Sequence, residues 1–240
     1  MHIRTVPIGG LTVRATGGHD GDGSGNGPLV ILLHGFGAPG DDLVPLAEVL
    51  EVPPGTRFLF PEGPLSLNAG YGDARAWWMV DMNRIAQDRA AGRMRDMSAD
   101  VPRGLPAARE AIESFLAELP KAMPVDPTRT VLGGFSQGAM LSCDHIMRTT
   151  YPCAALVQLS GSLLARMDWQ PSARRRGLPV FHSHGTHDEV LPFQMAERLR
   201  DELTGAGLTV DWHAFRGGHE LPHTVLARLG QFLTRVLAPR

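Results

Sequence analysis

Thr130-Val-Leu-Gly-Gly-Phe-Ser136-Gln-Gly138 decides the fold prediction, because an apolar run leads directly into Gly-x-Ser-x-Gly. The next nine residues, Ala139-Met-Leu-Ser-Cys-Asp-His-Ile-Met147, are apolar enough for a buried helix. A strand, a Gly-x-Ser-x-Gly turn and a helix in this order hold the serine on a sharp turn. Glycine is expected at 134 and 138 because side chains there would collide. The pattern predicts that Ser136 is a nucleophile at the carboxyl end of a strand.

Short apolar runs of strand length recur through the rest of the chain. They cover residues 29–33, 57–60, 155–159, 179–181 and 209–215. Most are apolar on both faces, which is typical of interior strands in a parallel sheet covered by helices. Apolar residues with helical spacing within 105–119, 196–203 and 225–236 predict helices between and after these runs. The alternation predicts an α/β fold with a mostly parallel central sheet and helices on both faces.

Domain organisation is expected to be simple. No linker, composition break or internal repeat divides the chain, so we expect a single domain over residues 1–240. Residues 61–102 form a long stretch that is rich in Gly, Arg, Met and Trp and has little periodicity. Long irregular segments in compact domains are often lids or binding loops. We therefore expect a lid-like loop at 61–102 over the active site.

Composition excludes several classes of function. The 240 residues are 43% hydrophobic and 20% charged, as in an ordinary globular protein. With 23 basic and 25 acidic side chains the net charge is −2, so we expect no nucleic-acid partner. The chain has neither an apolar run of membrane-spanning length nor a secretory signal at its start, which predicts a soluble, cytoplasmic protein. The two cysteines, Cys143 and Cys153, are expected to be buried, reduced thiols.

A nucleophilic serine needs a base within hydrogen-bond reach and an anion to orient that base. His219 follows the strand-like run that ends at 215, in Arg216-Gly-Gly-His219, and is the predicted base. Asp188 follows the run at 179–181, in His184-Gly-Thr-His-Asp188, and is the predicted acid. The chain order serine, aspartate, histidine is that of triads built on a Gly-x-Ser-x-Gly turn. We therefore predict a catalytic triad of Ser136, Asp188 and His219.

Two backbone N–H groups are candidates for an oxyanion hole. The N–H of Gln137 lies at the N-terminus of the predicted helix, where the helix dipole favours negative charge. The N–H of Phe36 lies in His34-Gly-Phe-Gly37, directly after the run 29–33. Glycines on both sides of Phe36 allow the main chain to turn its amides toward a developing oxyanion. His34 itself is interpreted as structural.

Other acids and histidines remain as alternatives for the triad. Glu189 adjoins Asp188, and Asp211 precedes His213 on the last predicted strand. His223 lies near His219, but within the helical pattern that follows. Cys143 falls two turns into the helix after Ser136, which is too far from the turn for a rival nucleophile.

A metal site is the competing interpretation of the histidine-rich stretch His182-Ser-His184-Gly-Thr-His187-Asp188. The stretch is close to the His-x-His-x-Asp-His ligand run of metallo-β-lactamase-like hydrolases. Thr186 stands where that run needs an aspartate, so a dinuclear site would lack a ligand. We therefore predict no metal and interpret these histidines as packing around the acid.

Apolar side chains near the predicted site are candidates for a substrate pocket. They are Trp77, Trp78, Met79 and Met82 in the long loop, Leu163 and Leu164 after Ser160-Gly161, and Leu191 after the acid. Aromatic and methionine side chains suit an acyl chain better than a sugar or a phosphate. Core packing of the loop explains any single one of them equally well.

The motifs together resemble the phospholipase/carboxylesterase family of α/β-hydrolases, which includes the acyl-protein thioesterases. The resemblance rests on His34-Gly-Phe-Gly37, Gly134-Phe-Ser-Gln-Gly138, His184-Gly-Thr-His-Asp-Glu-Val-Leu-Pro192, Gly217-Gly-His219 and Arg75-Ala-Trp77. It places the family's triad on the three residues named above. The chain departs from the family pattern at Ala38, where Asp is common, and at Ala139, where a second Gly is common.

The resemblance implies a serine carboxylesterase that needs no cofactor and acts on a small-molecule ester of short to medium acyl chain. A lysophospholipase or an acyl-protein thioesterase is the alternative within the family. A metal-dependent hydrolase and a hydrolase-fold binding protein without catalysis are the remote alternatives. A homodimer stays open.

Overall fold

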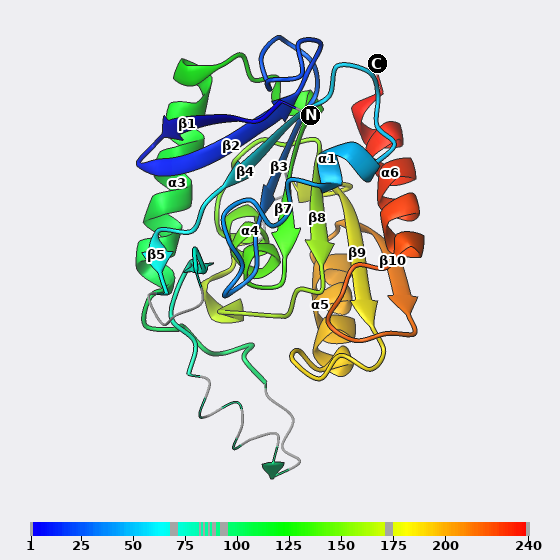
Figure 1. Cartoon of the computed structure of the whole chain (residues 1–240). Coiled ribbons are helices and arrows are strands. Elements are labelled where there is room, and N and C mark those ends of the chain that lie inside the picture. Colours follow the sequence, from blue (N-terminus) through cyan, green and yellow to red (C-terminus); the bar gives the residue numbers. More distant parts are fainter. Residues whose placement is uncertain are drawn as a thin grey trace.

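Eight strands form the central sheet in the order β1-β2-β4-β3-β7-β8-β9-β10 (Figure 1). The computed structural model describes residues 2–67, 72–81, 83, 85, 87, 90–91, 96–170 and 175–238. The strands of this sheet are β1 (Arg4–Ile8), β2 (Leu11–Gly17), β3 (Leu29–Leu33), β4 (Arg57–Pro61), β7 (Thr130–Phe135), β8 (Ala155–Leu159), β9 (Pro179–Gly185) and β10 (Thr209–Phe215). Neighbouring strands from β4 to β10 are parallel, which confirms the predicted α/β fold.

The antiparallel edge of the sheet was absent from the expectations. β1 and β2 form a hairpin, and β2 continues the sheet by pairing antiparallel with β4. Gly9 and Gly10 join the two strands with φ angles of 55° and 83°. A Gly-Gly pair between two alternating segments is a hairpin signal, because both turn residues need positive φ. The sequence therefore contained the information for this hairpin.

Two of the predicted strands are longer than their apolar runs. β7 and β9 continue to Phe135 and Gly185, past the last residues of their predicted segments, 132 and 181. The extension of β9 consists of His182, Ser183, His184 and Gly185, all of them buried. Polar residues at these positions hid the strand in the sequence, and both extensions lead directly to residues of the candidate site.

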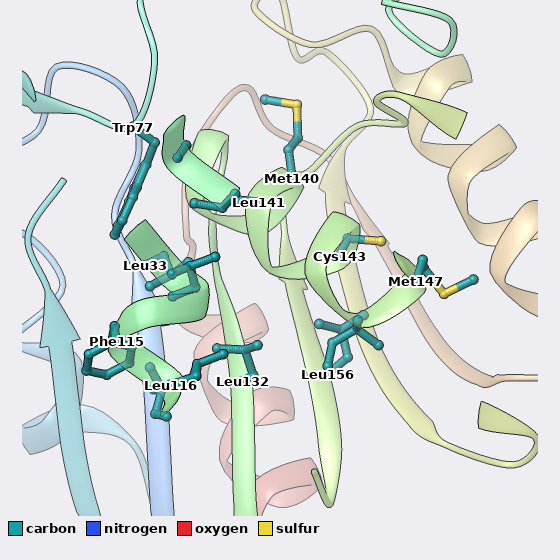
Figure 2. Close-up of a cluster of buried hydrophobic side chains, with 14 of the residues drawn as sticks. Leu33, Trp77, Phe115, Leu116, Leu132, Met140, Leu141, Cys143, Met147 and Leu156 are labelled. Carbon is teal, nitrogen blue, oxygen red and sulfur yellow. The ribbon is translucent and has the colours of Figure 1, made fainter. Parts of the chain in front are cut away.

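Helices cover both faces of the sheet. They are α1 (Leu46–Val49), α3 (Leu105–Ala122), α4 (Gln137–Arg148), α5 (Phe193–Gly205) and α6 (His223–Leu237), with short 3₁₀ turns η1 (Pro127–Arg129) and η2 (Arg166–Asp168). Apolar residues of α3, α4 and α5 pack on one face of the sheet, and those of α1 and α6 pack on the other. Figure 2 shows side chains of α4, among them Leu141 and Cys143, in one cluster with Leu132 and Leu156 of β7 and β8. This burial fixes α4, and with it the turn that precedes α4.

Residues 61–102 leave the carboxyl end of β4. Their described part contains a small two-stranded sheet, β5 (Leu65–Ser66) paired with β6 (Arg75–Ala76). In Figure 1 the coloured, described part of this segment reaches beyond the same edge of the sheet to which the arrowheads of β7 to β10 point. No helix within the described residues is long and apolar enough to cross a lipid bilayer.

Candidate active site

Ser136 stands on a strained turn between β7 and α4. Its φ and ψ are 54° and −117°, a backbone conformation that side-chain-bearing residues adopt rarely and at a cost. A Cβ on Gly134 would overlap the Leu33 carbonyl oxygen and lie 2.7 Å from the Gly138 carbonyl carbon. A Cβ on Gly138 would overlap the carbonyl groups of Leu33 and His34. The glycines are therefore required mainly by the close approach of the chain leaving β3, as well as by the turn itself.

Asp188 and His219 come together on loops that leave the adjacent strands β9 and β10. His219 Nδ1 lies 2.7 Å from Asp188 Oδ2. The two loops are joined by backbone hydrogen bonds from Thr186 to Phe215 and from His187 to Gly217. The imidazole of His219 also packs on the ring of Phe135, with centroids 4.8 Å apart.

The Asp188 carboxylate is held by a dense set of donors. Its Oδ1 accepts the N–H groups of Val190 and Leu191, each at 2.8 Å. Burial raises the pKa of Asp188, but the hydrogen bond and charge of His219 and the Leu191 N–H more than compensate, so the pKa lies below its ordinary value. An ionised carboxylate only accepts hydrogen bonds, so His219 carries its proton on Nδ1. Its Nε2 is then free to accept a proton.

Ser136 and His219 line the same cavity, which has a volume of about 680 Å³. Within the described part of the chain, Ser136 Oγ and His219 share no hydrogen bond. Catalytic hydrogen bonds are often long in the absence of substrate and tighten in the complex. The structure thus joins acid to base and places the serine on the wall of their cavity.

The loop that carries Phe36 is fastened at several points. Gly37 N–H donates to the Arg75 carbonyl at 2.8 Å, and Arg75 N–H donates to the Ala38 carbonyl at 2.9 Å. The guanidinium of Arg75 forms an ion pair with Glu62, which is 8% exposed. These backbone bonds hold the loop although Ala38 replaces the common aspartate, and the N–H of Phe36 donates to no other described residue.

His34 is buried and neutral, and its hydrogen bonds hold the same loop in place. Its Nδ1 donates to the Gly35 carbonyl at 2.8 Å, and its Nε2 accepts the Gly63 N–H at 2.8 Å. Burial lowers the pKa of His34, which agrees with an uncharged ring that donates from one nitrogen and accepts at the other. The indole of Trp77 donates to the His34 carbonyl at 3.1 Å.

Gln137 has a side-chain role that the sequence did not reveal. Its Oε1 accepts the Trp77 N–H at 2.8 Å, and its Nε2 donates to the Trp78 carbonyl at 2.9 Å. The first residue of α4 therefore fixes the segment that carries Trp78. Its backbone N–H opens α4, where an N–H lacks a partner within the helix.

The cavity is lined mainly by apolar side chains. Of the predicted pocket residues, Trp78, Met79, Leu164 and Leu191 line it. Trp77 and Leu163 do not: both are at most 1% exposed and pack in the hydrophobic core. Met82 lies outside the described residues.

Several pocket residues escaped the sequence analysis. They are Val80, Ile85, Met97, Val101, Met140 and Val190, with the polar or charged residues Asp81, Asp100 and Arg103; Phe36 and Glu189, predicted for other roles, line the cavity as well. Met140 stands four residues after Ser136, the spacing that places residues on one side of a helix, so this position was open to prediction. No comparable signal marks Met97 or Val101.

Of the alternative triad members, Glu189 lines the cavity, whereas Asp211, His213 and His223 lie apart from this arrangement. His213 pairs with Asp211 at 2.9 Å on β10, and neither lines the cavity. His223 is exposed at the start of α6. Burial raises the pKa of the Cys143 thiol, which suits a core residue and not a nucleophile.

The histidine-rich stretch is divided by burial. His182 and His184 are buried in β9, whereas His187 is exposed on the loop. Among the described residues, no group of three or more His, Cys, Asp or Glu side chains is placed to hold a metal ion.

Comparison with known proteins places the chain among esterases. The sequence profile of the phospholipase/carboxylesterase family matches residues 23–237. The acyl-protein thioesterase 1 of Yarrowia lipolytica is 31% identical over 78% of this chain and 82% of its own length. That of Kluyveromyces lactis is 28% identical over 87% of this chain and 92% of its own.

Solved structures agree with the fold. The crystal structure of esterase PE8 superposes with a TM-score of 0.73 at 27% identity, covering 95% of this chain and 99% of PE8. A carboxylesterase from Mesorhizobium loti superposes with a TM-score of 0.76 at 18% identity, covering 97% of this chain and 99% of its own.

Proposed function

The chain belongs to the phospholipase/carboxylesterase family of α/β-hydrolases, and we propose that it hydrolyses carboxylic esters of short to medium acyl chain through an acyl-serine intermediate on Ser136. One observation carries this proposal. The hydrogen-bonded pair of Asp188 and His219 stands at the wall of an apolar cavity that Ser136 also borders. The cavity therefore offers an acyl chain a place beside a group that can take the serine proton.

The reaction follows from these positions. His219 Nε2 takes the proton of Ser136 Oγ as Oγ attacks the carbonyl carbon, and the Phe36 and Gln137 N–H groups hold the resulting oxyanion. His219 returns the proton to the leaving alcohol as the ester C–O bond breaks. Water then attacks the acyl-serine and gives a proton to His219, which passes it to Ser136 Oγ as the acyl–Oγ bond breaks and the acid leaves. Asp188 keeps the imidazole in the useful tautomer throughout.

Replacing the nucleophile is the most direct test. Ser136→Ala should lower kcat/KM toward p-nitrophenyl butyrate by about four orders of magnitude or more and abolish labelling by a fluorophosphonate probe. Ser142→Ala, on the same helix, is the matched control and should keep labelling and at least a third of the activity. Labelling that persists in Ser136→Ala would overturn the proposal.

Acyl-chain length gives an independent test of the cavity. Each methylene buried in an apolar site contributes about 0.8 kcal/mol, so kcat/KM should rise about fourfold per added CH₂ until the cavity is full. A p-nitrophenyl ester series from acetate to palmitate measures this slope. A rise up to medium chains followed by a plateau or fall supports the proposal, and a flat series contradicts it.

Acyl-thioester hydrolysis is the second candidate function. It is favoured by the relatives named acyl-protein thioesterase 1, which match along most of their length. Matched octanoyl substrates that differ only in O or S at the scissile bond separate the two activities, with an octanoyl lysophospholipid as the third substrate. A kcat/KM more than tenfold higher for the thioester would assign the thioesterase.

A further inference from the structure

A polar patch interrupts the apolar face of the sheet behind the candidate site. Gln158, His182 and Trp212 are register partners across β8, β9 and β10, so their side chains share one face. His184 lies two residues further along β9 and shares that face. This face is otherwise packed by the apolar residues of α3, α4 and α5. Burying polar side chains in such a layer costs free energy unless they are hydrogen-bonded.

His184 differs from its neighbour His182 in what it contacts. Both imidazoles are 0% exposed. Both ring nitrogens of His182 are buried and lack a hydrogen-bond partner within the described residues. His184 Nε2 lies 2.8 Å from the Leu191 carbonyl oxygen and 3.3 Å from Asp188 Oδ2. His184 is thus in contact with the candidate catalytic carboxylate, and His182 is not.

The acceptor atoms near His184 determine which of its two ring nitrogens carries the proton. A carbonyl oxygen only accepts, so Nε2 must carry the hydrogen, and Nδ1 is left unprotonated. Burial lowers the pKa of His184, which agrees with a neutral ring. The titratable groups that act on it are Asp188, on the loop after its own strand, and His219, from the loop after β10. From α5, the helix packed on this side, Phe193 faces His184, and their ring centroids are 6.2 Å apart.

Asp188 Oδ2 is approached by two imidazole nitrogens, but it accepts a hydrogen bond only from His219, because the His184 N–H donates to the Leu191 carbonyl. His219 Nδ1 donates at 2.7 Å and His184 Nε2 approaches at 3.3 Å. The N–H dipole of an imidazole close to a carboxylate stabilises its anionic form and weakens its attraction for any other proton. The second imidazole therefore limits how strongly Asp188 stabilises the protonated form of His219.

We propose that His184 is a positioning residue that anchors the Asp188 loop through the Leu191 carbonyl and moderates the basicity of the Asp188–His219 pair through Oδ2. The inference rests on the proposed function, because it assigns a role within that triad. Its kinetic consequence is specific. Loss of the Nε2–H should move the acid limb of the kcat/KM profile to higher pH, since Asp188 would then favour protonated His219 more strongly. Loss of packing alone would lower activity without moving that limb.

Three variants separate the donor from the packing. His184→Leu removes the N–H and keeps most of the volume. His184→Gln places its amide N–H the same number of bonds from Cβ as the His184 Nε2–H and should restore the contact. His182→Leu removes a buried imidazole from the same face of β9 without touching Asp188. If His184→Leu does not fold, His184→Asn takes its place, because its amide is one bond too short to reach Oδ2.

The pH profile of kcat/KM for a p-nitrophenyl ester is the first readout. We expect the midpoint of the acid limb to rise by about half a pH unit or more in His184→Leu, with kcat reduced about tenfold. We expect it to stay within about 0.2 units of wild type in His184→Gln and His182→Leu. An unmoved limb in His184→Leu, or an equal movement in His182→Leu, would overturn the proposal.

A second readout does not depend on turnover. NMR titration of the His219 ring signals, recorded in the Ser136→Ala background, should show the same displacement to higher pH in His184→Leu. If no ester is hydrolysed by the wild-type enzyme, the proposed function fails while this titration still decides the role of His184. If the wild-type enzyme hydrolyses the ester but the His219 titration is unchanged in His184→Leu, only the proposed role of His184 is rejected.

Discussion

Two loops at the same edge of the sheet differ in what they present: one offers backbone N–H groups, and the other holds a negatively charged side chain. One loop, residues 34–38, carries the proposed oxyanion donor Phe36 and follows β3; the other, residues 186–191, carries the proposed acid Asp188 and follows β9. They are called the oxyanion loop and the acid loop. Both are fastened by a buried, neutral imidazole, His34 in the first and His184 in the second. His34 contacts backbone groups, whereas His184 contacts a backbone carbonyl and a charged side chain.

The difference follows from what each loop has to present. An oxyanion hole needs N–H groups with no partner, so its loop must be held by bonds at other positions, as the Arg75 backbone holds Gly37 and Ala38. A triad acid needs a buried charge, so its loop supplies donors to the carboxylate, as Val190 and Leu191 do for Asp188. Changes in the acid loop should therefore act on proton transfer, and changes around the oxyanion loop should act on geometry.

The largest effect is expected from removing the negative charge of Asp188. Asp188→Asn should lower kcat by about three to four orders of magnitude, because the amide no longer stabilises the His219 tautomer with Nδ1 protonated. Far-UV circular dichroism should stay unchanged. Glu189→Gln, the adjacent acid on the cavity wall, is the control and should cost less than tenfold. Equal losses in both variants would remove the distinction between these two carboxylates.

A smaller effect is expected from the fastening of the oxyanion loop. Arg75→Met removes the ion pair with Glu62 and loosens the backbone pairing to Gly37 and Ala38, so kcat should fall about tenfold. Arg14→Met removes the other arginine partner of Glu62, at 3.3 Å, without touching the loop. It should keep kcat within about twofold. Similar kcat values for the two variants would show that the loop does not depend on Arg75.

The smallest effect concerns the buried, neutral histidine that each of the two loops contains. Burial lowers the pKa of both His34 and His184 from the ordinary 6.5, so below pH 6.5 the unfolded chain binds protons that the folded chain does not. The free energy of unfolding should therefore fall as the pH drops from 7.5 to 5.5, by at most about 1.4 kcal/mol for each ring. The lowered pKa of Asp188 acts at more acidic pH, where its protonation removes stability.

Urea unfolding at pH 7.5 and 5.5 measures this loss. His34→Gln and His184→Gln should each reduce the difference between the two pH values by a similar amount. His145, whose pKa burial lowers to about 4, lies on α4 outside both loops, and His145→Gln should reduce the difference without altering kcat. A difference that is unchanged in all three variants would contradict neutral, buried rings.

The sequence predicted the elements that pack from their own patterns. The runs 29–33 and 155–159 coincide with β3 and β8, because strands buried on both faces read as continuous apolar segments. The run 209–215 coincides with β10, an edge strand that is only partly buried. The β1–β2 hairpin was missed because its strands alternate in burial and contain no continuous apolar run, although Gly9-Gly10 marks the turn between them. The end of β9 was missed because His182, Ser183 and His184 are polar, and the end of β7 was missed because it contains Gly133 and Gly134.

What the sequence alone determined is the set of chemical groups and the strand ends that carry them. Ser136, Asp188 and His219 follow strands whose carboxyl ends meet at one edge, because parallel pairing leaves no other arrangement. Only the tertiary structure decided which side chains face the cavity and which face the core, as Trp78 and Trp77 do. It alone placed His184 against Asp188 and Gln137 against the tryptophan backbone. Those contacts join segments far apart in the chain or depend on how a loop folds back, and no local spacing encodes them.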